Sequence, residues 1–143
     1  MNKLTTGLVA LAMIVSAGSA LAQDAAPQPK LAIELNAVQP VDGGCRVTFL
    51  ATNGLGSQLD RAAVEMALFK TDGGIDRIVT LDFKGLTADK TKVLQFQLSG
   101  LDCAGLGRVL INDITACEGE ALAADACLAA LVTSARPDIA FGV

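Results

Sequence analysis

Four cysteines are the residues of this 143-residue chain whose types and spacing most restrict its chemistry. They are Cys45, Cys103, Cys117 and Cys127. Four cysteines allow three disulfide pairings, and the most economical one joins Cys117 to Cys127 across a short loop and Cys45 to Cys103 across a long one. A redox or metal site is the alternative, but its thiolates usually come from C-x-x-C pairs, which this chain lacks. We therefore expect two structural disulfides.

Acidic side chains gather in the loop that the shorter bridge would close. Glu118, Glu120 and Asp125 lie between Cys117 and Cys127. Carboxylates grouped in this way can bind a cation or a basic partner, whereas the alternative is a solvated acidic loop without a ligand. We take these three residues as the candidate interaction loop, and we predict no metal site.

Asn112 and Asp113 interrupt the most continuously apolar segment, residues 107–114. A carboxylate on such a strand must face solvent, pair with an arginine or accept backbone hydrogen bonds. Arg46 and Arg108 are the candidates for pairing. We expect a structural pairing rather than catalysis, because no second carboxylate at catalytic spacing can be identified.

The chain contains no histidine, tryptophan or tyrosine. Without imidazole there is no Ser-His or Cys-His pair and no zinc or copper site that needs histidine ligands. A formal net charge of −4 also argues against nucleic acid and anionic membranes, because both reward clustered Lys and Arg. We therefore predict that the protein is not an enzyme, and we assign no catalytic residue and no cofactor.

Residues 1–22 predict export. Lys3 precedes a short apolar run, and Ala20-Leu21-Ala22 forms an A-x-A cleavage site before Gln23. The run is too short to span a bilayer and no second one follows, so we expect no membrane span after cleavage. The sequence thus predicts a signal peptide over 1–22, a flexible leader with two prolines over 23–30, a single domain over 31–143 and a periplasmic, oxidising location.

The mature chain reads as short strands separated by turns. Apolar and polar residues alternate in several segments, with turn residues such as Asp42-Gly43-Gly44 and Asp72-Gly73-Gly74 between them. The expected strands cover residues 31–36, 45–51, 64–68, 77–83, 93–99, 107–114 and 128–135. Alanine and glutamate between Cys117 and Cys127 favour one short helical excursion. This spacing predicts an all-β, antiparallel sandwich of about seven strands.

One segment resembles FxLYD-type and related immunoglobulin-like bacterial domains. The resemblance rests on residues 66–70 (MALFK) followed by Asp72-Gly73, on Gly85-Leu86 and Thr91, and on Phe96 in the next strand. The whole mature chain, including the segment LDCAGLGRVLIND at residues 101–113, is also similar to small uncharacterised periplasmic proteins of alphaproteobacteria. This likeness implies an exported immunoglobulin-like sandwich and carries over no functional residue.

Two functions fit these observations. The first is an exported, non-enzymatic β-sandwich module that binds another envelope protein through its sheet edges or its acidic loop. The alternative is a periplasmic protein that binds a small ligand or a cation between the sheets or at that loop.

Overall fold

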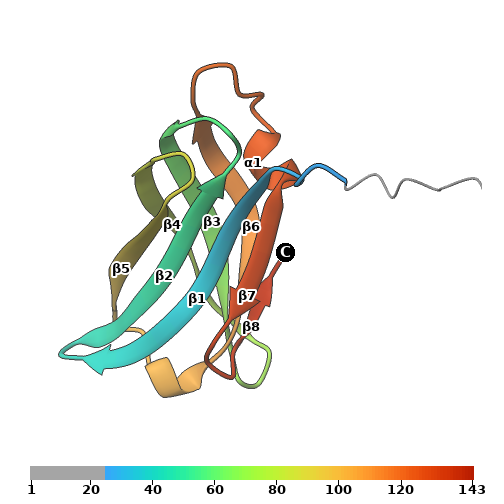
Figure 1. Ribbon diagram of the computed structural model, residues 1–143. Helices are drawn as coiled ribbons and strands as arrows, with labels where there is room; N and C mark the ends of the chain where they lie inside the picture. The colour runs from blue at the N-terminus through green and yellow to red at the C-terminus, as the bar shows by residue number, and fades with distance from the viewer. Residues whose placement is uncertain (1–24) are drawn as a thin grey trace, which may run out of the picture.

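The computed structural model describes residues 25–143, which form a sandwich of two β-sheets (Figure 1). The expected signal peptide lies outside the described residues, and residues 25–29 are exposed and belong to no helix or strand. The elements are β1 (Lys30–Val41), β2 (Gly44–Gly54), β3 (Leu59–Lys70), β4 (Ile75–Leu86), β5 (Thr91–Ser99), the 3-10 turn η1 (Cys103–Gly105), β6 (Leu106–Glu118), α1 (Ala126–Ala129), β7 (Leu131–Ala135) and β8 (Ala140–Gly142).

Each sheet contains four strands. The first sheet has the order β5-β2-β1-β7 and the second has the order β4-β3-β6-β8. The predicted sandwich is confirmed, but its two C-terminal strands correct the expectation of a wholly antiparallel fold: β7 runs parallel to β1, and β8 runs parallel to β6. Strand β6 finishes at the end of the sandwich where β1 begins, and the segment with α1 crosses there to the first sheet, so β7 starts beside the start of β1 (Figure 1). Strand β7 then runs to the other end, where β8 starts beside the start of β6.

The C-terminal elements also differ from their predicted positions. The segment 128–135 is not one strand, because α1 extends to Ala129 and β7 begins at Leu131. The helical turn expected between Cys117 and Cys127 lies at the end of that loop, since α1 begins only at Ala126. A helix this short takes its place from tertiary contacts rather than from helix propensity. Strand β8 has only 3 residues, too few for alternation to reveal it.

The two turns predicted from Asp-Gly pairs are confirmed. Gly43, between β1 and β2, has a φ of 76°, and Gly73, between β3 and β4, has a φ of 88°. Glycine reaches this left-handed region without the steric cost that a side chain would add. The carboxylate of Asp72 accepts the backbone N–H of Gly74 at 2.8 Å, which fixes the second turn from within the loop.

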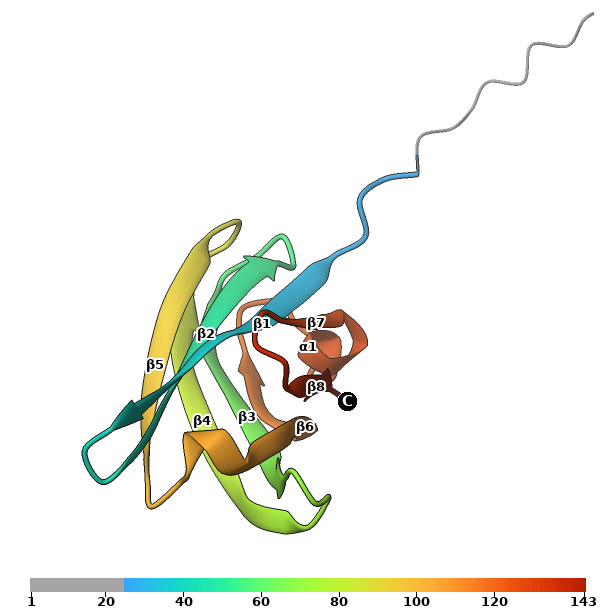
Figure 2. The same ribbon diagram turned by 90° about the horizontal axis from the view of Figure 1, so that it is seen from below.

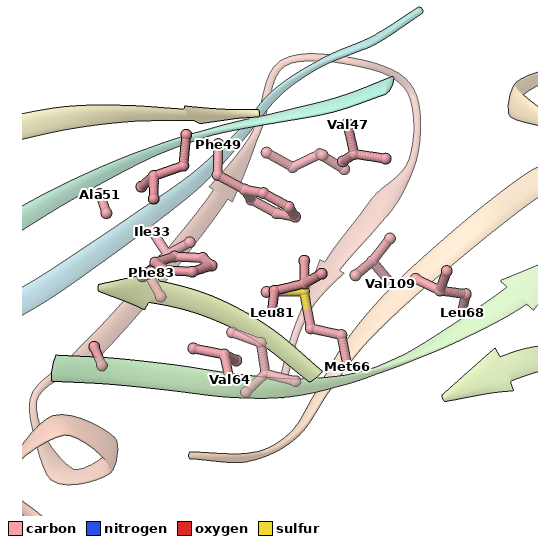
Figure 3. Packing of buried hydrophobic residues seen from close by; sticks show 14 of the residues in the cluster. Ile33, Val47, Phe49, Ala51, Val64, Met66, Leu68, Leu81, Phe83 and Val109 are labelled. Atoms are coloured by element: carbon pink, nitrogen blue, oxygen red, sulfur yellow. The ribbon is translucent and has the colours of Figure 1, made fainter. Parts of the chain in front are cut away.

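The core lies between the two sheets and is centred on Phe49 of β2. Its ring centroid lies 5.8 Å from that of Phe83 on β4, 6.2 Å from that of Phe96 on β5 and 5.7 Å from that of Phe141 on β8. Figure 3 shows Phe49 and Phe83 facing each other across the core. Because its ring contacts strands of both sheets, Phe49 holds the layers together by apolar burial.

Alternate residues of strand β4 face the core. Leu81 and Phe83 are buried and Val79 is half-buried, whereas Ile78 and Thr80 between them are exposed. This assignment of inner and outer faces determines which side chains of the second sheet are available to a partner.

Candidate interaction surfaces

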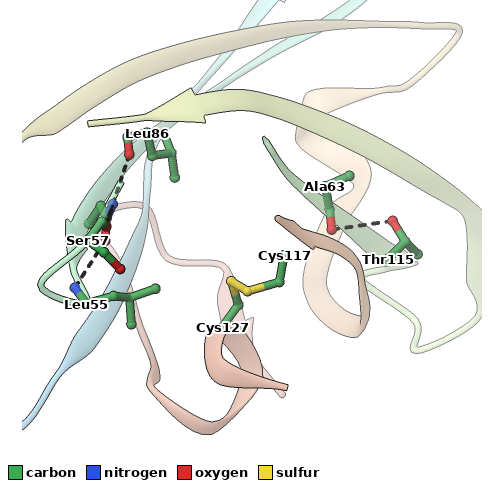
Figure 4. Close-up of a disulfide and its surroundings, with 8 residues drawn as sticks. Leu55, Ser57, Ala63, Leu86, Thr115, Cys117 and Cys127 are labelled. Carbon is green, nitrogen blue, oxygen red and sulfur yellow. Dashed lines mark hydrogen bonds between the residues drawn. A yellow bond between two sulfur atoms is a disulfide. The ribbon is translucent and has the colours of Figure 1, made fainter. Parts of the chain in front are cut away.

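Two disulfides lie at opposite ends of the sandwich, and each ties one strand to a short helical segment outside the sheets. Cys45 of β2 is bonded to Cys103 of η1, with Cα atoms 5.3 Å apart, and Cys117 of β6 is bonded to Cys127 of α1, with Cα atoms 5.9 Å apart. Figure 4 shows the second bridge. The predicted pairing is confirmed, and none of the four cysteines is free. Two disulfides indicate an oxidising compartment outside the cytoplasm.

The three acidic residues of the candidate interaction loop do not converge on one point. Oε1 of Glu118 lies 3.7 Å from Nη1 of Arg61, while Glu120 and Asp125 are exposed and form no salt bridge within residues 25–143. No group of three or more Asp, Glu, His or Cys side chains in the described part of the chain is arranged to hold a metal ion. The structure therefore places these residues on one exposed segment without assembling them into a site.

Asn112 and Asp113 lie at a register shift in β6 and face solvent. Nδ2 of Asn112 donates to Oε1 of Glu65 at 2.6 Å, and Oδ1 of Asp113 accepts the backbone N–H of Ile114 at 2.8 Å. Of the three arrangements expected for Asp113, the structure shows exposure to solvent and a backbone hydrogen bond, and none of the salt bridges in residues 25–143 pairs it with an arginine. Exposure at the bulge leaves the carboxylate hydrated, and no counter-charge is needed.

Strand β3 is buried on both of its faces along most of its length. Met66 and Leu68 point into the core (Figure 3), and Ala67, which points outward, is still only 3% exposed. In the strand register Ala67 lies between Ile78 of β4 and Leu110 of β6. Directly opposite side chains on one face of a sheet contact each other, so these two larger side chains cover the alanine.

These residues belong to an apolar strip on the outer face of the second sheet, which we define as Ala67, Phe69, Ile75, Ile78 and Leu110. Phe69 is paired with Ile75 as Ala67 is with Ile78. Ile75 and Ile78 are each 54% exposed. Sequence reasoning missed this strip because it combines one or two residues from each of three strands. The signal that could have found it is the apolar character of β3 at outward as well as inward positions.

Polar groups border the apolar strip at both ends. The guanidinium carbon of Arg108 lies 5.8 Å from the ring centroid of Phe69, close enough for a cation–π contact. Glu65, held by Asn112, follows on the same face of β3. An apolar centre with a polar rim is the usual composition of a protein interaction surface.

The outer face of the first sheet is polar and is hydrogen-bonded across its strands. The hydroxyls of Thr52 and Thr91 lie 2.7 Å apart, and Nε2 of Gln95 donates to the Thr48 hydroxyl at 3.2 Å. Its large exposed apolar side chains, Val93 of β5 and Val132 of β7, are on opposite edge strands of this sheet. Val93 lies opposite half-buried Leu50 of β2, whereas Val132 is at the far edge of the sheet, so these side chains do not form one contiguous patch.

Basic side chains connect the two sheets on the side where β4 and β5 form the edges. Nζ of Lys92 donates to the backbone carbonyls of Phe83 at 3.2 Å and Gly85 at 3.1 Å. Nη1 of Arg77 donates to the backbone carbonyl of Ser99 at 2.7 Å. These contacts occupy backbone carbonyls near the C-terminal ends of β4 and β5. They leave the backbone groups in the middle of β5 without a side-chain partner among the described residues.

Asn53 is a buried polar residue that positions the loop between β2 and β3. Its Nδ2 donates to the carbonyls of Ser57 at 2.9 Å and Leu86 at 2.8 Å, and its Oδ1 accepts the N–H of Leu55 at 3.1 Å. Figure 4 shows these three partners near the second disulfide. The sequence predicts only a turn at this position, because nothing in the dipeptide Asn53-Gly54 reveals that the side chain is buried.

Asp82 lies on the outer face of β4, near one end of the sheet. Its pKa is below the usual aspartate value because its carboxylate accepts the backbone N–H of Lys84, with further contributions from the Lys84 and Arg61 side chains. Both side-chain nitrogens lie 3.2 Å from Oδ2. The ionised form of Asp82 is therefore favoured in the folded protein.

Comparisons with protein-family models, with curated proteins and with solved structures found no match to this chain. Among the residues that the structure describes, no helix is long and apolar enough to cross a membrane.

Proposed function

We propose that the protein is an exported, non-enzymatic β-sandwich module that binds another protein of the cell envelope. The observation that carries this proposal is the apolar strip on the outer face of the second sheet. Ile75 and Ile78 are each 54% exposed beside nearly buried Ala67, so the strip presents apolar area to solvent. Contiguous exposed apolar surface with a polar rim marks sites of protein interaction.

The residue types of the apolar strip suit a protein partner. Covering Ile75 and Ile78 would remove apolar area from water, which favours association in proportion to the area removed. Arg108 stacked on Phe69 adds two residue types that are common at the centre of interfaces. A sheet face of this kind fits an apolar face of a folded partner better than it fits a small polar ligand, for which a concave pocket is usual.

Several features support the periplasm as the location and an immunoglobulin-like fold as the framework. The two disulfides fit a periplasmic protein, as does the signal peptide that the sequence predicts. The order β1-β2-β5 in one sheet and β4-β3-β6 in the other corresponds to strands A-B-E and C′-C-F of immunoglobulin domains. The absence of histidine and of a catalytic constellation in the sequence supports a binding role rather than an enzymatic one.

The alternative, binding of a small ligand or a cation, was expected at the acidic loop or between the sheets. Glu118 is already paired with Arg61, and Glu120 and Asp125 are separately exposed. An open pocket at this loop is lined by Asp60 and Glu120, but no group of three acidic, histidine or cysteine side chains in the described residues is arranged to hold a cation. The apolar strip is therefore the better-supported site.

The proposal is tested by crosslinking in cells, followed by capture of the tagged protein from the native envelope and mass spectrometry. The variant Ile78→Glu places a charge in the apolar strip, and Val132→Glu is the matched control on the outer face of the first sheet, where Val132 is 45% exposed. We expect wild type and Val132→Glu to capture the same partner in similar amounts. The amount captured by Ile78→Glu should fall at least about tenfold, because the substitution places a charge at a position that the interface buries. Equal capture by all three proteins, or capture of nothing, would contradict the proposal.

A further inference from the structure

Strand β5 forms an open edge of the first sheet. Within residues 25–143 it pairs with β2 alone, in a register that runs without a shift from Thr91 to Ser99. Between these ends it contains one charged residue, Lys92, and neither proline nor glycine. Such an edge leaves a row of unpaired backbone N–H and C=O groups that can serve as a template for another strand.

The other edges of the two sheets are protected. Strand β4 has register shifts towards both ends of its pairing with β3, and Lys92 covers two of its carbonyls. Strands β7 and β8 have only 5 and 3 residues, and they lie side by side where the two sheets meet (Figure 2). The middle of β5 has none of these protections.

Hydrogen bonds beyond each end of β5 determine which of its backbone groups face away from β2. The N–H of Asn53 donates to the carbonyl of Lys90, and the N–H of Gly100 donates to the carbonyl of Gly43. In an antiparallel pair, residues that exchange hydrogen bonds alternate with residues whose backbone groups point away. Counting from either end gives the same result. The residues in the middle of β5 that point away from β2 are Val93, Gln95 and Gln97.

We propose that the occupant of this edge is a second copy of the chain, with the two β5 strands antiparallel around a two-fold axis at Gln95. In this register Gln95 pairs with Gln95 of the other copy, and Val93 pairs with Gln97. The outward N–H and C=O groups of all three residues then find partners. The first sheets of the two copies become one continuous sheet. This association goes beyond the proposed function and uses a surface separate from the apolar strip.

Charge and apolar exposure favour a second copy as the occupant. The three outward side chains are neutral, so two chains that each carry a net negative charge do not repel each other where the strands meet. The antiparallel register brings Lys90, before β5, towards the end of the other copy that carries Asp42 and Asp102, and all three side chains are exposed. On the inner face, half-buried Phe96 and Leu98 gain cover from the added strand.

A charge exchange at the two-fold axis tests both the association and its register. The exported, disulfide-bonded chain is studied by sedimentation velocity at low salt, as wild type and as Gln95→Lys and Gln95→Glu. Gln95 is exposed and its side chain makes one hydrogen bond, to Thr48, so both variants are expected to fold, which thermal melting verifies. Val132→Lys is the control on the opposite edge strand of the same sheet.

We expect the wild type and Val132→Lys to form dimers that dissociate on dilution. Each Gln95 variant alone should raise the dissociation constant at least about tenfold, because it places like charges opposite each other, and an equimolar mixture of the two should restore dimers.

A dimer that neither Gln95 variant weakens would overturn the proposal. So would a wild type that is monomeric up to about 1 mM. In that case, crosslinking from a photoreactive residue at Val93 to a different protein would assign the edge to a foreign strand. The purified chain is tested without its envelope partner, so failure here is separate from failure of the proposed function.

Discussion

The outer faces of the two sheets are built from the same kind of strand and yet carry opposite chemistry. On the first sheet, Thr52 and Thr91 lie hydroxyl to hydroxyl, and Gln95 donates to Thr48. On the second sheet, the apolar strip occupies the equivalent outward positions, and Arg108 lies over its end. The first face satisfies its polar groups within the molecule, whereas the second leaves apolar area in contact with water.

This difference separates what folding requires from what binding requires. Both inner faces contribute to one core around Phe49, and each sheet has one strand that a disulfide ties to a neighbouring helical segment. Since the first sheet is stable with a polar outer face, the fold itself does not demand an apolar outer face on the second. We therefore interpret the apolar strip as a binding feature.

The largest expected effect is the difference in the free energy of unfolding between substitution of Phe49 in the core and substitution of Phe69 in the apolar strip. Phe49→Ala should lower the free energy of unfolding by about 3 to 5 kcal/mol, because the ring is 1% exposed and contacts three other rings. Phe69→Ala, in the apolar strip, should cost less than about 1 kcal/mol. Urea unfolding measures both. If the two substitutions cost the same, the apolar strip belongs to the packing of the fold and the comparison fails.

We expect the two disulfides to contribute different amounts to the free energy of unfolding, which urea unfolding also measures. Their cysteines are separated by 58 residues in the first bridge and by 10 in the second. The chain-entropy model assigns about 4 kcal/mol to closure of the longer loop and about 3 kcal/mol to the shorter one. The double variant Cys45→Ala/Cys103→Ala should therefore be less stable than Cys117→Ala/Cys127→Ala. The reverse order would show that the end of the sandwich near α1 depends more on its bridge than loop length predicts.

The smallest expected effect is a pH dependence at the edge of the second sheet. The pKa of Asp82 is lowered in the folded state, so its contribution to stability is present above the unfolded pKa of about 3.9 and is lost as the pH falls through the folded value. Asp82→Asn should melt slightly below wild type at neutral pH, and this difference should disappear in acid. Asp125→Asn is the control, because the Asp125 carboxylate is exposed and makes no capping hydrogen bond to α1. A difference that stays constant with pH would contradict this account.

Much of the fold follows from local sequence. Alternation of apolar and polar residues predicts strands β2 and β5, which pair without a register shift in the structure. The Asp-Gly turns predict where β1 and β3 end. The disulfide pairing follows from the spacing of the four cysteines in a chain for which the sequence predicts a signal peptide. Parallel pairing of β7 and β8 could not be predicted, because both strands are short and their partners lie far away in the sequence.

The candidate surfaces were harder to predict for a physical reason. An interaction loop is visible in sequence as a run of charges, and this run led to Glu118, Glu120 and Asp125. A sheet face combines single residues from neighbouring strands, so Ile78 and Leu110 become neighbours only once β4, β3 and β6 are in register. The burial of Asn53 likewise depends on contacts made by a separate loop.

Site-specific photocrosslinking in living cells tests the central claim most directly. A photoreactive residue replaces Ile78 in one protein and Val132 in another, so that the two probes lie on the outer faces of different sheets at positions of similar exposure. The account predicts a discrete protein adduct from position 78 and none from position 132. No adduct from position 78, or the same adduct from both positions, would contradict the assignment of the apolar strip as the binding surface.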